Sequence, residues 1–318
     1  MKKLISIVAP MYNEEKLVEA YCTETLRMAD SLAERYDFEI ILVNDGSRDR
    51  TYELMLAQQE LRPRELSVIC LSRNFGLEGA VNAGIRYARG DAVVVMDADL
   101  QDPPALIPEM LRHWEEGADV VVGSRISRSS DGFLKKLTAN LYYKVLNSLS
   151  GKIKLERSAA NFRLLSRKAL DQVLALPEAN GVFRVVVPFV GMKTAVVEYD
   201  RDKRYAGKTK YNLKSMIPYA LDSITGISVA PLRRLLQIQP VMLILLAAAL
   251  IGLIVSGSDW KQTWFLVLCI GIFCELICIA LAVIGEYVAQ IMTEAKGRPI
   301  SIVYAYRPGE NAKERQEK

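Results

Sequence analysis

The chain has 318 residues, 51% of them hydrophobic, and a formal net charge of +4 at pH 7. This length allows one sizeable globular domain and a further segment, and the mild positive charge gives no reason to expect nucleic acid as a partner. The single histidine, His113, lies in a predicted helix, which argues against histidine-dependent catalysis.

The first 125 residues alternate between strand-like and helix-like segments. Short apolar runs predict strands at 4–10, 38–44, 66–72, 91–97 and 118–123. Helical patterns fill 14–35, 51–61, 77–89 and 105–116. This alternation is typical of a doubly wound, mainly parallel α/β sheet. The apolar run that ends at Pro10 is too short for a signal peptide, so we expect the chain to begin with a strand.

Two apolar runs follow in the C-terminal third of the chain. Residues 235–256 contain no charged residue, and residues 264–284 contain only Glu275. Each run is long enough to cross a bilayer, which takes about 20 residues. Basic residues flank both outer ends, so the positive-inside bias predicts a transmembrane hairpin whose two ends face the cytoplasm. The alternative is a buried helical pair in a soluble protein, which the length and the flanking arginines disfavour.

We therefore expect four parts: a catalytic domain over 1–211, an amphipathic juxtamembrane segment over 212–234, the hairpin over 235–285 and a cytoplasmic tail over 286–318. The apolar stripe of the juxtamembrane segment either packs on the catalytic domain or lies among lipid headgroups, and we favour the headgroups. Glu275 is a functional candidate because ionisable groups are costly inside a membrane. It is either protonated or paired across subunits.

An acidic segment, Met96 to Pro104, directly follows the predicted strand at 91–97. Side chains two apart on a strand point to the same side, so Asp97 and Asp99 are expected to aim at one spot, with the Gln101 amide nearby. Such an all-oxygen cluster suits Mg²⁺ or Mn²⁺, whose open positions substrate phosphates fill. Ligands of α/β sheets bind at this end of the strands. The plain alternative is a turn before two prolines.

The loops after the first two predicted strands face the same crevice. Tyr12 could stack on a nucleobase, and Asp45 could accept hydrogen bonds from its N–H groups. The alternative for each loop is an ordinary turn or helix cap.

Several motifs in this order resemble family 2 glycosyltransferases with the GT-A fold. They are Pro10-x-Tyr12-Asn13-Glu14, Asn44-Asp45-Gly46-Ser47, Arg73-Asn74-x-Gly76, Asp97-Ala98-Asp99-Leu100-Gln101-Asp102-Pro103-Pro104, Gly123-Ser124-Arg125, Asn161-Phe162-Arg163-Leu164, Arg204-Tyr205-Ala206-Gly207-Lys208-Thr209-Lys210-Tyr211 and, after the hairpin, Gly285-Glu286-Tyr287 and Glu294-x-Lys296-x-Arg298-Pro299. The order is similar to that of polyprenyl-phosphate glycosyltransferases, which include dolichyl-phosphate mannose synthases. The hairpin and the Arg-Pro tail resemble the bactoprenol glucosyltransferases.

The resemblance implies a role for each matching residue. The nucleoside would be held by Pro10, Tyr12, Glu14 and Asp45. The divalent ion that bridges the donor diphosphate would be bound by Asp97, Asp99 and Gln101. Catalytic roles fall to Asp99, Asn161 and Arg204, the last as a phosphate clamp. The acceptor phosphate would meet Arg125, Lys136, Lys208 and Lys210, although a solvated helix face explains Lys136 equally well.

Asn161 departs from the family pattern, which often has Asp at this position with a base-like or orienting role. An amide cannot take up a proton at neutral pH. A phosphate monoester has a second pKa of about 6 and is mostly dianionic, so the reaction does not require a strong base. We therefore expect an active enzyme in which Asn161 orients the acceptor or the sugar.

The sequence thus predicts inverting transfer of one hexose from a nucleotide sugar to undecaprenyl phosphate, with glucose from UDP-glucose as the family-weighted donor. N-acetylglucosamine, galactose and mannose remain open. A processive polysaccharide synthase fits poorly, because the Gln-x-x-Arg-Trp signature is absent. A non-catalytic membrane scaffold that binds nucleotide sugar is the third alternative. The expected setting is a bacterial inner membrane, with a multi-pass chain, a cytoplasmic catalytic domain and homo-oligomers.

Overall fold

The computed structural model describes residues 2–125, 159–176, 183–200 and 260–316, with a few positions between 232 and 251. These residues belong to two compact units. The first includes the described residues up to 200 and those from 299 onward, and the second includes the described residues from 232 to 298.

The first unit is built on one eight-stranded mixed sheet with the strand order β7-β5-β6-β4-β1-β2-β3-β8. Strands β1 to β4 run parallel to one another, β6 is inserted antiparallel between β4 and β5, and β8 pairs antiparallel with β3. The strands are β1 (Lys3–Met11), β2 (Tyr36–Asn44), β3 (Leu66–Leu71), β4 (Ala92–Val95), β5 (Val120–Arg125), β6 (Ala159–Ser166), β7 (Thr194–Tyr199) and β8 (Val303–Arg307).

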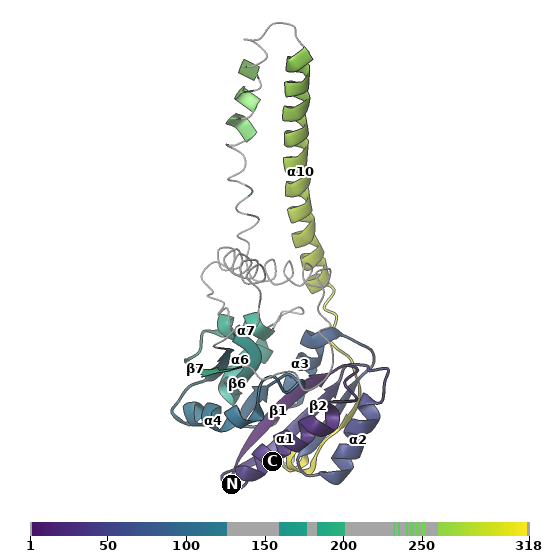
Figure 1. Cartoon of the computed structure of the whole chain (residues 1–318), viewed down its shortest axis with the longest axis vertical. Coiled ribbons are helices and arrows are strands. Elements are labelled where there is room, and N and C mark those ends of the chain that lie inside the picture. The colour runs from purple at the N-terminus through teal and green to yellow at the C-terminus, as the bar shows by residue number, and fades with distance from the viewer. Residues whose placement is uncertain are drawn as a thin grey trace. The chain divides into compact units, whose positions relative to one another are not determined.

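Helices cover both faces of this sheet (Figure 1). One core lies under α1 (Val18–Ser31), α2 (Thr51–Leu61) and α4 (Ile107–Glu115), the last preceded by the short helix η1 (Pro104–Leu106). The other core lies under α3 (Gly76–Tyr87), α6 (Arg167–Ala175) and α7 (Phe183–Val190). Because both faces are covered, the central strands are apolar and buried along nearly their whole length, as in α/β proteins generally.

The predicted α/β class is confirmed, and all five predicted strands and four predicted helices are present. Two boundaries differ in a way that shapes the site. The helix expected from residue 14 begins only at Val18, because the Glu14 and Glu15 amides donate to side chains of Thr51 and Asp49. The strand expected over 91–97 ends at Val95, so Asp97 and Asp99 lie on the loop after β4 rather than on a strand.

The second unit contains one long apolar helix, α10 (Trp260–Ala295), of 36 residues. At 1.5 Å per residue it is about 54 Å long, more than a bilayer's hydrocarbon core requires. Its segment Phe265–Ala295 has the length and composition to span a membrane, with a mean hydropathy of 2.9 in its most apolar window, none of which is buried. Glu275 lies on this helix and is exposed.

The first expected span, 235–256, lies largely outside the described residues, as does the juxtamembrane segment. The described positions between 232 and 251 are helical, and two of them, Met242 and Leu246, line an apolar cavity together with α10 residues such as Ile270 and Phe273. The hairpin as a whole stays a prediction.

The C-terminal segment differs from the expected tail over 286–318. Helix α10 continues to Ala295, and the residues after it form β8 and α11 (Glu310–Gln316) within the first unit. Side chains fix this segment to the sheet: the Asn311 amide donates to the Phe38 carbonyl at 2.8 Å, and Arg315 pairs with Asp91 at 2.8 Å. Residues 299–316 are therefore part of the first unit.

Candidate functional site

The loops after β1 and β2 are bound to each other through polar side chains. The Asn13 amide donates to the Ser47 hydroxyl at 3.0 Å, and the Asn13 side-chain oxygen accepts from the Arg48 amide at 2.8 Å. Asn13 has a φ of 51°, a conformation that Asn tolerates better than most residues. Pro10 is buried at the end of β1, while Tyr12 and Glu14 are half-buried in the loop that follows. The predicted nucleoside residues of this loop thus lie at the carboxyl end of the sheet.

Asp45 holds the start of α3. It is 3% exposed, and its carboxylate accepts hydrogen bonds from the amides of Phe75 (2.7 Å) and Gly76 (3.0 Å) and from the Asn74 side chain (2.9 Å). Burial raises the pKa of Asp45 to about 6, although these donors oppose the rise. These donors come from the third loop, so Asp45 joins the second and third loops, and its expected contact with a nucleobase stays a prediction.

The loop after β4 carries the acidic cluster. Leu100 adopts a φ of 56°, and the Gln101 amide donates to the Asp99 carboxylate at 3.2 Å, which bends the segment into a compact turn. Burial raises the pKa of Asp97 to about 6, and the carboxylates of Asp102 and Asp99 add to the rise. Asp97 and Asp99 are therefore close in space, although the cause is a turn rather than strand alternation.

Arg125 and Asp102 form an ion pair beside this loop. Asp102 is fully buried and accepts from the Arg125 guanidinium through Nε at 3.3 Å and Nη2 at 3.0 Å. The Tyr199 hydroxyl donates to the same carboxylate at 2.5 Å. Arg125 was expected to meet the acceptor phosphate; the structure orients it by a carboxylate and a phenol, with 24% of its side chain exposed.

The inserted strand β6 carries Asn161 near the carboxyl end of β4. In the β4–β6 pairing Val95, the last residue of β4, is opposite Arg163, so Asn161 lies two residues beyond this pair on β6. Asn161 is 2% exposed, and its side-chain oxygen accepts from Nε (3.4 Å) and Nη2 (3.3 Å) of Arg184 on α7. Arg184 and Arg125 both lower the pKa of Asp97, so two cations lie near the acidic cluster.

The donor set suits a hard divalent ion held jointly with a substrate. Asp97, Asp99 and Gln101 offer oxygen ligands only, which Mg²⁺ and Mn²⁺ prefer. Among the described residues no group of three His, Cys, Asp or Glu side chains could hold a metal by itself. One or two carboxylates completed by substrate phosphates are the usual magnesium arrangement, so the residues fit an ion that binds together with a diphosphate.

Several predicted site residues lie outside the described residues: Lys136, Arg204, Lys208 and Lys210. Sequence reasoning missed Arg184 and Tyr199, and it did not foresee that Asp102 pairs with Arg125. The signal for Arg184 was present, since it is the one charged residue in the apolar run Gly181 to Gly191. A charge in such a run is costly unless it is paired, and Asn161 provides a partner.

Comparisons with known proteins agree with this geometry. The sequence profile described as Glycosyl transferase family 2 matches residues 6–174. An uncharacterized glycosyltransferase of Bacillus subtilis, YkcC, is 38% identical over 316 residues, covering 94% of this chain and 92% of that protein. A prophage bactoprenol glucosyl transferase homolog of Escherichia coli is 36% identical over 303 residues, covering 94% and 98%.

Among solved structures, mannosyl-3-phosphoglycerate synthase from Rubrobacter xylanophilus superposes with a TM-score of 0.51 at 21% identity, covering 74% of each chain. That likeness concerns the fold. The profile match, the close relatives and the mixed sheet with its acidic loop after β4 lead to one conclusion: this chain belongs to glycosyltransferase family 2 and has a GT-A-like fold.

Proposed function

We propose that this protein transfers one hexose, best assigned as glucose from UDP-glucose, to undecaprenyl phosphate at the cytoplasmic leaflet of a bacterial inner membrane. The observation that carries the proposal is the acidic loop after β4 with Arg125 and Arg184 beside it, because a diphosphate donor and a phosphate acceptor both need cations. The bactoprenol relative supports a polyprenyl acceptor, and the exposed apolar helix α10 supports a membrane location.

In this proposal the donor lies across the carboxyl ends of β1, β2 and β4, with its nucleoside at the loop of Tyr12 and its diphosphate at Asp97 and Asp99. A bound Mg²⁺ or Mn²⁺ would supply positive charge to the leaving diphosphate. An oxygen of the acceptor phosphate forms the new bond to the anomeric carbon. The bond from that carbon to the diphosphate breaks, its electron pair leaves with the nucleoside diphosphate, and the configuration inverts.

The arginines and Asn161 hold the reacting phosphates. Arg125 is fixed by Asp102, so its guanidinium stays oriented while the acceptor binds. Asn161 cannot act as a base, and its contact with Arg184 gives it an orienting role. The acceptor phosphate is already mostly dianionic at pH 7, so no proton must be removed from it by a side chain. Arg204, Lys208 and Lys210 are proposed as further phosphate contacts, and so is Lys136, for which a solvated helix face is the alternative.

The test is a transfer assay with purified full-length protein, undecaprenyl phosphate and a panel of radiolabelled nucleotide sugars, with and without Mn²⁺. We expect a lipid-linked product from one donor, its loss in Asp99→Asn and its loss on chelation of divalent ions. Arg86→Ala, an exposed change on α3, serves as the control and should keep the activity of the wild type. Absence of lipid product from every donor would refute the proposal. Rescue of an inactive wild type by Asn161→Asp would refute the role given to Asn161.

A further inference from the structure

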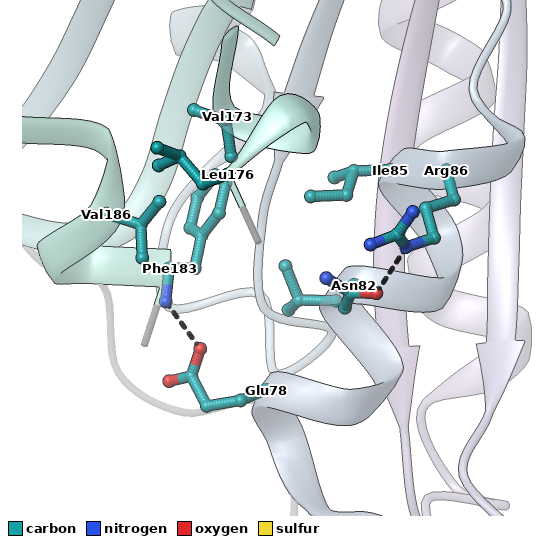
Figure 2. A pocket seen from close by; sticks show the side chains of 9 residues that line it. Glu78, Asn82, Ile85, Arg86, Val173, Leu176, Phe183 and Val186 are labelled. Atoms are coloured by element: carbon teal, nitrogen blue, oxygen red, sulfur yellow. Dashed lines mark hydrogen bonds between the residues drawn. The ribbon is translucent and has the colours of Figure 1, made fainter. Parts of the chain in front are cut away.

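A hydrogen bond joins α3 to α7 on the face of the sheet that both helices cover. The Glu78 carboxylate accepts from the Phe183 amide at 2.8 Å, although 105 residues separate the two positions. Figure 2 shows Glu78 pointing from α3 toward the first residue of α7, at the edge of a small cavity lined by residues of α3, α6 and α7. The bond therefore ties the start of one helix to the start of another.

Each end of this bond leads to the candidate site. Glu78 is in the first turn of α3, and Asp45 holds that turn through the amides of Phe75 and Gly76. Phe183 directly precedes Arg184, whose guanidinium donates to Asn161. Glu78 is thus bonded to the residue directly before Arg184, and the Arg184 guanidinium lies near Asp97.

The bond also suits the local electrostatics. The first amides of a helix lack partners within it and carry partial positive charge, so a carboxylate placed there forms a strong, charge-assisted hydrogen bond. Glu78 meets this condition at Phe183, the first residue of α7, and it is itself an acidic residue in the first turn of α3. On the far side, the Arg184 carbonyl accepts from Nη1 of Arg163 at 3.1 Å, so the main chain on both sides of Arg184 is held.

We propose that Glu78 is a positioning residue that fixes the start of α7, so that the Arg184 guanidinium stays between Asn161 and the acidic loop during transfer. This inference rests on the proposed function. The contribution that we assign to Glu78 passes through the Phe183 amide. Misplacing a charged group by about 1 Å can reduce a rate by up to roughly 100-fold.

The first measurement is hydrogen–deuterium exchange of the segment 183–190 in purified full-length variants. Glu78→Ala removes the acceptor and is expected to speed exchange in this segment. Glu78→Gln keeps an amide oxygen that can accept from Phe183 and is expected to preserve the protection. Arg86→Ala is the matched control, because Arg86 lines the same cavity from the same helix but bonds to Asn82. Unchanged exchange in Glu78→Ala would refute the inference without reference to activity.

The second measurement is steady-state transfer by the same variants. Glu78→Ala is expected to lower kcat roughly 10- to 100-fold with KM for the nucleotide sugar nearly unchanged, and Glu78→Gln to stay within about threefold of wild type. If Glu78→Ala exchanges faster in this segment but keeps the kcat of the wild type, the position of α7 does not affect transfer. That result would overturn the positioning role of Glu78. If the wild type transfers no sugar at all, the proposed function fails and the catalytic part of the inference fails with it, while the exchange data still decide whether Glu78 holds α7.

Discussion

Asp45 makes the stability of the folded protein depend on pH. Its pKa is raised from 3.8 to about 6 by burial, which the donors at Phe75 and Gly76 only partly offset. The folded state therefore binds this proton more tightly than the unfolded state does. Stability from Asp45 is fully present below about pH 4 and is lost as the pH rises through about 6. A shift of about two pKa units corresponds to about 3 kcal/mol.

The perturbation that isolates this effect is Asp45→Asn. The variant replaces one carboxylate oxygen with an NH2 group, so one or two of the three donors lose their acceptor, and its stability differs from that of the protonated wild type by an offset that does not titrate. Only the wild type loses stability as Asp45 ionises. The free energy of unfolding of the wild type, relative to that of Asp45→Asn, therefore falls by up to about 3 kcal/mol between pH 4 and 7. For a domain of this size that is roughly 6–12 °C in the difference of melting temperatures.

The assay is thermal unfolding of both purified proteins without nucleotide, followed by near-ultraviolet circular dichroism at half-unit steps of pH. Taking the difference removes the titration of every other group. A difference that stays constant would refute the raised pKa. A stability of the wild type that rises with pH relative to that of the variant would mean that the three donors outweigh burial and that the pKa lies below its ordinary value.

Three further substitutions test local features of the site. Gly46 has a φ of 63°, and a Cβ there would lie 2.4 Å from the Arg73 carbonyl carbon, so Gly46→Ala should lower stability by about 2–5 kcal/mol in thermal unfolding. Gly76→Ala, at a φ of 81° with no atom within 4 Å, should cost only about 1–2 kcal/mol, and equal losses would contradict the steric argument. Asp102→Asn should destabilise the protein by about 3 kcal/mol and lower kcat, because it leaves the Arg125 guanidinium without its charge partner; melting temperature and transfer rate measure both effects, and an unchanged kcat would argue against the role of Arg125.

The parts of the fold that follow from local pattern could be predicted from the sequence. The four parallel strands β1 to β4 are apolar runs between helical segments, and such runs carry a clear signal. Strand β6 carries a weaker one, because Asn161 and Arg163 interrupt its apolar pattern. Strand β8 comes after α10, and only its pairing with β3 makes it part of the sheet. Long-range pairing of this kind is not visible in a local window.

The residues of the candidate site also divide into those that could be predicted from the sequence and those that could not. Asp97 and Asp99 could be predicted from their spacing and from the motif around them, although the turn at Leu100 brings them together instead of a strand. Arg184 could not be placed, because its relation to Asn161 depends on how α7 packs against β6. The pairing of Arg125 with Asp102 was equally hidden, since 23 residues and a helix separate the two positions.

The antiparallel strand β6 adds a second set of residues beside the loops that follow the parallel strands. Strands β1, β2 and β4 are followed by the loops that carry Tyr12, Asp45 and Asp97, all at the carboxyl ends of the parallel strands. Because β6 runs in the opposite direction, its beginning lies at the end of β4, where Val95 pairs with Arg163, two residues after Asn161. Helix α7 then adds Arg184 from the covering layer. This arrangement brings residues of the parallel strands, of β6 and of α7 to one end of the sheet, and the proposed transfer between two phosphate-bearing substrates would use residues from all three.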